Sequence, residues 1–374
     1  MKRILLLSCV IVTFGIILSL NREPVVAPIV EAPVEVPSTP DSSPIPVPPK
    51  PTYEDAIASI NEAELKSDVY FLASEELEGR MSGKKGNIAA AEFIKKKYES
   101  FGLDTEYQKF NIQRMNPGPK KETGDNFTQN VYAWVKGKKY PDQIVIIGAH
   151  MDHIGYGPSM SRWGGGKIHP GADDNASGTA CLMAIAKAYA MLSDDVQRTV
   201  VFQSYSAEEM GLLGARYYCD NPTFPKDNPS LKKHIFMANM DMVGWLRQGH
   251  GAAMFTDGYS SPDIAKIISS LDNKYPFAQR ITSRGSGGSD HACFYNKGVP
   301  VVFMHTGGHA HYHTPTDTAD KINYDGMEQI AKYVFELTWK VVQDESIPKF
   351  DTKNFKPMEY IHDHGHKDIE FPKE

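Results

Sequence analysis

Short apolar runs of β-type composition alternate with longer stretches in which apolar residues recur at helical spacing. The runs predicted as strands are Val131–Val135, Gln143–Ile147, Thr199–Tyr205, His234–Met240 and Val299–His305. The stretches predicted as helices are Tyr53–Leu72, Gly86–Phe101, Gly178–Leu192 and Gly326–Val342. Strands separated by helices predict an α/β fold, here a three-layer α/β/α sandwich around a mostly parallel mixed sheet.

The first 20 residues break this pattern. Lys2 and Arg3 precede a nearly unbroken apolar run from Ile4 to Leu20. Such a run is typical of a secretory signal peptide, or of an uncleaved anchor just long enough to cross a bilayer, and no clean cleavage site decides between them. Cys9 lies in a stretch that resembles a bacterial lipidation box, but the apolar run continues beyond it. In each case we expect an exported protein that is secreted, periplasmic or tethered to the cell surface.

Residues 21–52 form a proline-rich segment that holds ten of the chain's 25 prolines. It has no periodic apolar face with which to offset its ordering entropy, so it is predicted as a linker or disordered leader. One catalytic domain is expected over residues 53–345, followed by a polar C-terminal extension over 346–374. The histidines of that extension, His362, His364 and His366, are expected to be incidental exposed side chains.

The charge and the cysteine content exclude several classes of protein. The formal net charge is −6 and there is no long basic run, which argues against a nucleic-acid partner. After the leader only Cys181, Cys219 and Cys293 remain, too few for a zinc finger or a disulfide-rich scaffold. A Cys219–Cys293 disulfide would suit an exported protein, but spacing alone does not establish it.

Histidines and carboxylates gather where predicted strands end. They are His150 and Asp152, then Glu208 and Glu209, then Asp241, then His305, His309, His311 and His313, with Asp173 and Asp174 just before a helix. Each has an ordinary alternative as a helix cap, a solvated pair or an exposed loop residue. Together, however, they lie where open α/β sheets bind ligands. Imidazoles with several carboxylates suit Zn²⁺, and more than four such ligands suggest two ions sharing a carboxylate.

Six motifs in order also resemble one enzyme family: GAHMDHIG, PGADDNASG, SAEEMGLLGA, NMDMVG, GGSDHACF and YHTPTDT. Their sequence and order are similar to those of secreted dinuclear zinc aminopeptidases of the bacterial leucyl-aminopeptidase type. Relatives of that family include glutamate carboxypeptidases and glutaminyl cyclases. The upstream segment LASEELEGRMSGKKGN resembles the family's N-terminal helix and loop, so the resemblance runs from about Leu65 to Val342.

The resemblance implies roles for individual residues. Glu208 would be the general base and Asp152 would orient the imidazole of His150. The implied metal ligands are His150 and Asp241 on one zinc ion, Glu209 and His313 on a second, and Asp174 on both. Of the adjacent aspartates, Asp173 would then be a loop or cap residue.

The chain also departs from the family pattern. Well-known members carry a tyrosine in the loop where this chain has Ser286-Gly287-Gly288. Tyr312, directly before His313, resembles a tyrosine of other members that assists catalysis, and its alternative role is packing beside the site. Asp290 and His291 match a family motif and are expected to support the site or fix a loop, and His309 and His311 to flank it.

The resemblance implies an exopeptidase that removes N-terminal residues from peptides with a free N-terminus, using two zinc ions and Glu208. The chain has neither the G-x-S-x-G nor the H-E-x-x-H motif of other hydrolases. A carboxypeptidase, a glutaminyl-cyclase-like enzyme and a non-catalytic binding module are alternatives on this fold. Against them, no basic cluster for a substrate carboxylate is evident, and all five ligands and the base are present. Membrane contact is expected only through the N-terminus, and the oligomeric state is not predicted.

Overall fold

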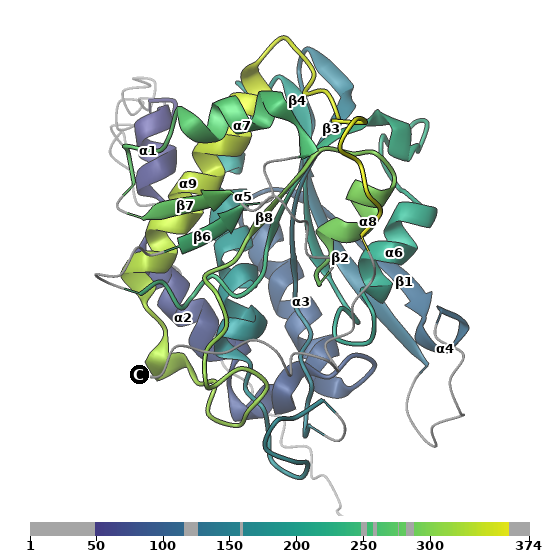
Figure 1. Cartoon of the computed structure of the whole chain (residues 1–374), viewed down its shortest axis with the longest axis vertical. Helices are drawn as coiled ribbons and strands as arrows, with labels where there is room; N and C mark the ends of the chain where they lie inside the picture. Colours follow the sequence, from purple (N-terminus) through teal and green to yellow (C-terminus); the bar gives the residue numbers. More distant parts are fainter. Residues whose placement is uncertain are drawn as a thin grey trace, which may run out of the picture. The chain divides into compact units, whose positions relative to one another are not determined.

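The computed structural model describes residues 49–115, 126–157, 160–247, 253–256, 260–275, 277–281 and 288–358 (Figure 1). The chain divides into two compact units, Met1–Pro49 and Lys50–Glu374, and the described helices and strands all lie in the second. The signal-like run, nearly all of the proline-rich segment and the three tail histidines lie outside the described residues.

A six-stranded sheet forms the middle layer of the domain. Its strands are β1 (Asp104–Asn111), β2 (Phe127–Val135), β3 (Tyr140–His150), β4 (Arg198–Tyr205), β5 (His234–Met240) and β8 (Val301–Met304). They lie in the order β1-β2-β4-β3-β5-β8. The β1–β2 and β2–β4 pairs are antiparallel, and the β4–β3, β3–β5 and β5–β8 pairs are parallel. The predicted mixed, mostly parallel sheet is therefore confirmed.

Two apolar clusters cover the two faces of this sheet. Successive residues of a strand point to opposite faces, so Val145 and Ile147 of β3 join one cluster and Ile144 and Ile146 the other. The first cluster is built with α1 (Tyr53–Ala58), α2 (Glu62–Leu72), α3 (Lys85–Ser100), α5 (Gly178–Met191) and α9 (Tyr324–Gln343). The second is built with α6 (Leu213–Asp220) and α8 (His291–Asn296). Both faces of β3 are buried, which gives the predicted three layers (Figure 1).

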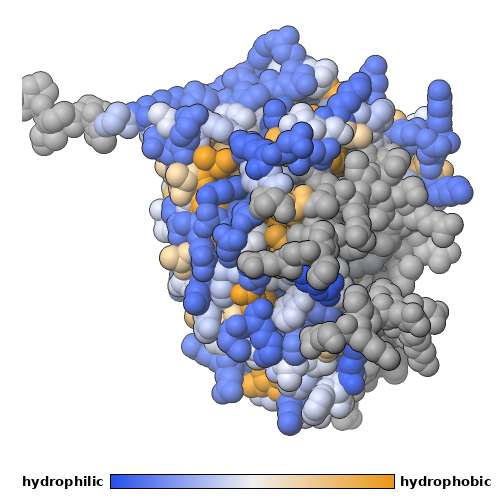
Figure 2. All heavy atoms as spheres, turned by 60° about the vertical axis from the view of Figure 1, so that its left-hand side comes forward, coloured by the Kyte–Doolittle hydropathy of each residue, from blue (hydrophilic) through white to orange (hydrophobic). Residues whose placement is uncertain are grey.

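The remaining elements are short. They include α4 (Ile112–Met115), α7 (Pro262–Ser269) and a parallel ribbon of β6 (Ala253–Thr256) with β7 (Ala278–Ile281). The described part of the C-terminal extension packs on α8, where the rings of Phe350 and Phe355 lie 5.3 and 5.4 Å from that of Tyr295. In the view of Figure 2 the coloured surface is mostly hydrophilic, with small separate apolar areas.

Two element predictions need correction. The stretch Tyr53–Leu72 was predicted as one helix but forms two, because Asn61 caps the second by accepting the Glu64 N–H at 3.0 Å. Strand β1 was not predicted, since its sequence DTEYQKFN is largely polar and it pairs with β2 alone at the edge of the sheet. Gly102 ends α3 with a left-handed φ of 77°, a conformation that glycine adopts without steric cost.

The three cysteines of the domain are free, buried thiols. Cys219 on α6 and Cys293 on α8 share one apolar cluster, whereas Cys181 lies in α5 on the other face of the sheet. The suggested Cys219–Cys293 disulfide is therefore not formed in this structure. Within the described residues, no helix is long and apolar enough to span a membrane.

Candidate metal centre

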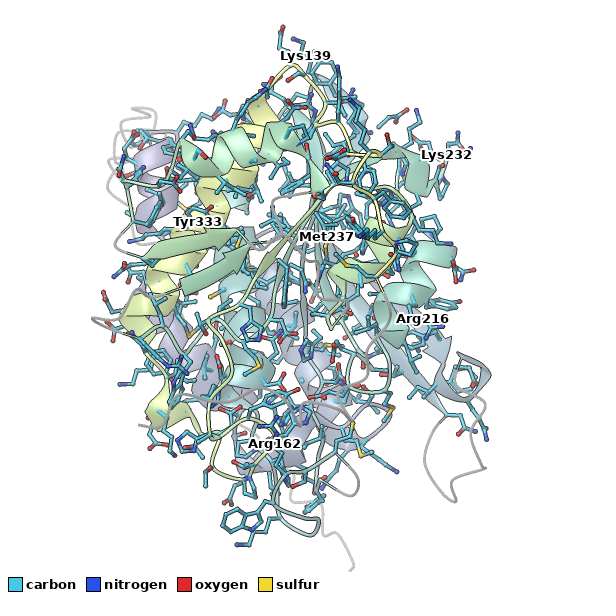
Figure 3. All side chains as sticks on the ribbon, in the orientation of Figure 1. Lys139, Arg162, Arg216, Lys232, Met237 and Tyr333 are labelled. Carbon is cyan, nitrogen blue, oxygen red and sulfur yellow. The ribbon has the colours of Figure 1, made fainter. Side chains whose placement is uncertain are left out.

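The loops that leave the carboxyl ends of the strands carry the candidate ligands to one place. His150 ends β3, Glu208 and Glu209 follow β4, and Asp241 follows β5. Asp174 lies in the turn before α5, and His313 lies in the loop after β8. All of these side chains are buried. The site can be found in Figure 3 near the label of Arg162, toward the lower end of the molecule. The backbone N–H of Arg162 donates to the His313 carbonyl at 3.0 Å.

One set of candidate ligands, here called the His150 group, consists of His150, Glu208 and Asp241. Each offers a nitrogen or oxygen atom within 4.8 Å of the others. The Nε2 atom of His150 lies 3.2 Å from Oδ1 of Asp241. It also lies 3.4 Å from Oδ1 of Asp174.

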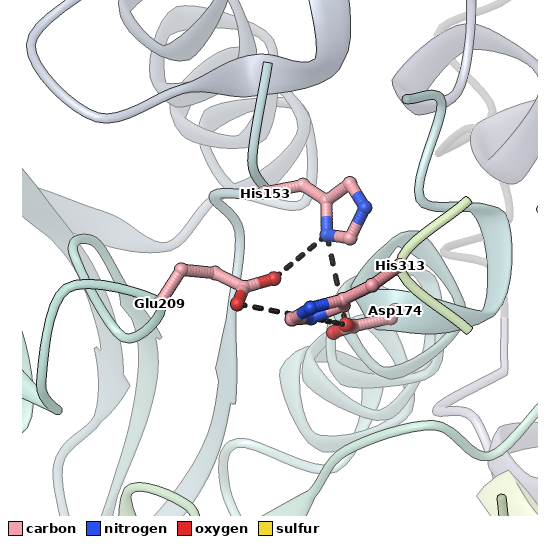
Figure 4. A group of neighbouring side chains, drawn as sticks. All are labelled: His153, Asp174, Glu209 and His313. Atoms are coloured by element: carbon pink, nitrogen blue, oxygen red, sulfur yellow. Dashed lines mark hydrogen bonds and ion pairs between the residues drawn. The ribbon is translucent and has the colours of Figure 1, made fainter. Parts of the chain in front are cut away.

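A second set, the His313 group, consists of His153, Asp174, Glu209 and His313 (Figure 4). Nε2 of His313 lies 3.0 Å from Oδ2 of Asp174 and 3.1 Å from Oε2 of Glu209. Nδ1 of His153 lies 2.7 Å from Oε1 of Glu209. Because Asp174 directs one oxygen to His313 and the other to His150, its carboxylate joins the two groups.

In both groups, imidazoles and carboxylates that lie close together shift one another's pKa. Burial by itself lowers the pKa of His150, but Asp241 and Glu208 outweigh it and raise that pKa well above its ordinary value. The pKa of His313 is likewise lowered by burial but raised well above its ordinary value by Glu209 and Asp174. Burial opposes ionisation of Asp174, yet the nearby imidazoles of His150 and His313 hold its pKa well below the usual range. The imidazoles and carboxylates of the two groups thus shift one another's pKa values in opposite directions.

Asp152 connects His150 with Glu208. Nδ1 of His150 lies 3.3 Å from the Asp152 carbonyl and 3.7 Å from Oδ1 of its carboxylate. That same Oδ1 accepts the backbone N–H of Glu208 at 3.2 Å. The predicted orienting role of Asp152 remains a prediction, but its side chain is in place for it, with the main-chain carbonyl making the shorter contact.

Asp173 and Asp317 hold the turn that carries Asp174. Asp173 accepts the Gly244 N–H at 2.6 Å and lies 2.9 Å from Nε2 of His309. Asp317 accepts the N–H groups of Asp173 and Asp174 at 3.0 and 3.1 Å. Burial and the charge of Asp173 raise the pKa of Asp317 to about 6. The expectation of a loop-fixing Asp173 agrees with these contacts.

Arg80 contacts the ligand loops and is completely buried. Its guanidinium donates to the carbonyls of Met151 and Gly171 at 2.9 and 2.8 Å, and also to those of Leu72 and Pro170. Burial lowers the pKa of Arg80 to about 10, while the carboxylates of Asp174 and Asp317 oppose that change. The Arg80 guanidinium therefore links the loop after β3 to the turn before α5 through hydrogen bonds.

The backbone is strained where it presents several of these side chains. Ala207, Met242 and His313 have positive φ angles of 58°, 56° and 54°, a region that side-chain-bearing residues seldom adopt. Ala207 precedes Glu208 and Met242 follows Asp241, so the strain coincides with the site. Such strain is commonly retained at functional sites.

Other sequence candidates lie around the site and belong to neither group. Tyr312 stacks on the His313 ring with centroids 3.9 Å apart, and Arg162 lies 4.9 Å from the Tyr312 centroid. Its catalytic role remains a prediction. His309 is buried and stacks on Trp245, and His311 is paired with Thr316. Asp290 and His291 are completely buried, while His305 bonds to the Gly307 N–H.

His153 is the member of the site that the sequence reasoning missed. It directly follows Asp152 in GAHMDHIG. The motif contains two histidines, and taking both as candidate site residues would have included His153. It is 1 % exposed. Its membership depends on contact with Glu209 from another loop, which the local sequence does not show.

The donor set fits zinc. His150 Nε2, His313 Nε2 and Asp241 Oδ1 are buried and have no hydrogen-bond partner in the described part of the chain. Buried polar atoms ordinarily have partners, and these three point into the ligand groups, where a cation would satisfy them. Imidazole nitrogens with carboxylate oxygens are common zinc ligands.

Two known proteins are similar to this chain in sequence. Aminopeptidase YwaD of Bacillus subtilis is 27% identical over 266 residues, which cover 64% of this chain and 54% of YwaD. Leupeptin-inactivating enzyme 1 of Streptomyces exfoliatus is 25% identical over 290 residues, covering 72% and 58%. The chain thus spans just over half the length of these relatives.

Solved structures show the same fold. The zinc aminopeptidase BSAP of Bacillus subtilis superposes with a TM-score of 0.61 at 17% identity, covering 78% of this chain and 98% of that one. Glutaminyl cyclase of Bacteroides thetaiotaomicron gives a TM-score of 0.58 at 19% identity, covering 77% and 99%.

The match to the family described as Peptidase family M28 extends over residues 130–338, more than half of the 374 residues. It includes every residue of the His150 and His313 groups. The chain belongs to peptidase family M28.

Proposed function

We propose that this protein is a zinc-dependent aminopeptidase that holds two zinc ions and removes N-terminal residues from peptides. The observation that carries the proposal is the position of Asp174. Its two oxygens lie 3.4 Å and 3.0 Å from imidazole nitrogens of different ligand groups, as expected of a carboxylate shared by two ions. The aminopeptidase names of the relatives and of the similar structures support the same activity.

Five residues would hold the two ions. His150 and Asp241 would bind the first and Glu209 and His313 the second, with Asp174 on both. Support comes from the 3.0–3.4 Å separations between the nitrogen and oxygen atoms of these residues. When bound, zinc would supply Lewis acidity that polarises the scissile carbonyl and acidifies a water molecule.

Glu208 would act as the general base. It lies in the His150 group, for which the proposed ligands are His150, Asp174 and Asp241. Burial raises its pKa well above the ordinary value, and Asp241 and Glu209 add to this effect while His150 opposes it. A carboxylate with a raised pKa accepts a proton from water more readily and can then donate it to the leaving amine. Asp152 would hold the Glu208 backbone through the 3.2 Å hydrogen bond.

Hydrolysis of a panel of aminoacyl-amide substrates tests this proposal. Each substrate is supplied with a free and with an acetylated N-terminus, before and after treatment with a zinc chelator. We expect hydrolysis of the free forms only, loss of activity with chelator and recovery on adding zinc. Chelator-resistant activity, or cleavage confined to blocked substrates, would contradict the aminopeptidase assignment. In a parallel assay with unblocked peptides, release of C-terminal residues would instead indicate a carboxypeptidase.

We also propose that the protein is exported. Lys2, Arg3 and the apolar run Ile4–Leu20 support this location. Fractionation of cells expressing the full chain, with and without residues 1–20, measures it directly. Retention of the full-length protein in the cytoplasm would contradict the proposal.

A further inference from the structure

His153 makes the shortest contact within the His313 group. Its Nδ1 lies 2.7 Å from Oε1 of Glu209 and 3.6 Å from Oδ2 of Asp174 (Figure 4). The other oxygen of Glu209, Oε2, faces Nε2 of His313 at 3.1 Å. Glu209 is therefore held between two imidazoles from different loops. His153 is either a further zinc ligand or a residue that positions Glu209.

The distance favours the positioning role. Two ligand atoms on one tetrahedral zinc, each bonded at about 2.0–2.1 Å, lie roughly 3.3 Å apart. The pairs that involve the five proposed ligands are separated by 3.0–3.4 Å. The His153–Glu209 pair, at 2.7 Å, is shorter and falls in the range of a charge-assisted N–H···O hydrogen bond.

The second nitrogen of His153 leads to the same conclusion. A zinc-bound histidine usually donates its other N–H to a carboxylate or carbonyl. Nε2 of His153 is buried and meets no hydrogen-bond partner among the residues that the structure describes. Binding zinc through Nδ1 would leave a buried Nε2–H unsatisfied. With the proton on Nδ1, by contrast, His153 donates to Glu209 and only a lone pair remains at Nε2.

The surroundings fix the ring in this orientation. The His153 backbone N–H donates to the Arg80 carbonyl at 3.4 Å, and the ring meets His313 edge-to-face with centroids 5.5 Å apart. On another side it packs on Gly171, where a Cβ atom would lie only 2.5 Å from Cγ and Cδ2 of the ring. The imidazole thus has little freedom to turn away from Glu209.

We infer that His153 is a positioning residue that donates an Nδ1–H hydrogen bond to Oε1 of Glu209, so that Glu209 presents Oε2 alone to the ion beside His313. This inference rests on the proposed two-zinc site. It assigns to the second ion a carboxylate ligand whose orientation is set before the ion binds. The expected consequence is tighter zinc binding at the His313 group.

Zinc titration of the full chain tests the inference with the variants His153→Ala and His153→Asn. Affinity is measured by competition with a chelating dye, and stoichiometry by elemental analysis. Loss of a hydrogen bond to a ligand typically weakens metal binding about 10–100-fold, and we expect this for one of two ions in His153→Ala. The Asn side chain can place an N–H near the position of Nδ1, so His153→Asn should bind within a few-fold of wild type. His234→Ala removes another buried imidazole, one that bonds to Tyr218, and should leave zinc affinity unchanged.

The outcomes separate the alternatives. If His153→Asn loses as much affinity as His153→Ala, or if His153→Ala binds both ions normally, the inference is overturned. Wild-type protein that binds fewer than two zinc ions would instead overturn the two-zinc proposal. Circular dichroism of the metal-free variants checks folding. Should His153→Ala not fold, His153→Leu, which keeps the bulk of the side chain but has no donor, replaces it.

Discussion

Glu208 and Glu209 are neighbours in sequence and equally buried, at 8% exposure, yet they belong to different ligand groups. In the His150 group, burial raises the pKa of Glu208 well above its ordinary value, and Asp241 adds to this effect. In the His313 group, burial acts in the same direction, but His313 and His153 outweigh it and lower the pKa of Glu209 to about 2. Glu208 is thus the carboxylate suited to accept a proton, and its neighbour Glu209 is the one suited to stay ionised.

The difference arises from geometry rather than from residue type. Both imidazoles of the His313 group lie within 3.1 Å of Glu209 oxygens. Glu208 shares His150 with Asp241 and Asp174, whose Oδ1 atoms lie 3.2 Å and 3.4 Å from Nε2 of His150. The opposite pKa shifts of the two adjacent glutamates therefore follow from how many imidazoles each one contacts.

Asp174→Ala should have the largest effect, because it removes the carboxylate that joins the two groups. We expect the zinc content to fall from about two ions per chain to less than one, with activity below detection, since both positions lose a ligand. Elemental analysis after dialysis measures the content. Asp194→Ala, at an exposed position on the surface, is the control. Retention of two tightly bound ions by Asp174→Ala would show that the groups are independent.

Glu208→Gln should separate catalysis from metal binding. The amide keeps the shape of the side chain but cannot accept a proton, so kcat should fall by about 10²–10⁴-fold with zinc content unchanged. Steady-state kinetics and elemental analysis on the same preparation measure both quantities. The assignment of Glu208 as base fails if turnover stays near the wild-type rate.

Asp152→Asn should weaken the His150 group alone. Asp152 contacts His150 and accepts the Glu208 N–H, so zinc affinity at one position and kcat should each fall by about 10–100-fold. The other position should be unaffected, in contrast to the effect expected of His153→Ala. A two-step zinc titration resolves the positions. Equal weakening of both would mean that Asp152 acts on the whole site.

The smallest effect concerns His234, a histidine outside the site, whose contribution to the pH dependence of stability can be measured separately. Burial lowers the pKa of His234 to about 4 from an ordinary 6.5. The unfolded chain therefore binds more protons in this window. The free energy of unfolding should fall as the pH drops from 6.5 to 4, by up to about 3 kcal/mol from this residue.

Denaturant unfolding of the metal-free protein at several pH values measures that slope. His234→Gln keeps an acceptor for Tyr218 but does not titrate, so its slope should be shallower by the contribution of His234. The slope that remains then includes the site. An identical slope in both proteins would show that His234 is not buried as an uncharged imidazole.

The sequence predicted those parts of the fold in which local pattern and burial coincide. The runs around Ile144–Ile147 and His234–Met240 are buried on both faces and were found as strands, whereas polar β1 at the sheet edge was not. The positions of the candidate carboxylates and histidines were predicted from the ends of the strands. The choice of Asp174 rather than Asp173 as a ligand came only from the family resemblance. His153 was missed because its role is set by a contact with Glu209, far along the chain.

Arg80 bears on where the functional unit of this protein begins. The family match starts at residue 130, but the guanidinium that fastens the ligand loops belongs to a segment well before it. A recombinant fragment that starts at the family boundary would leave the carbonyls of Met151 and Gly171 without this donor and the nearby carboxylates without its charge. We therefore expect a fragment that assembles the two ligand groups to include Arg80, although the match to the family model begins at residue 130.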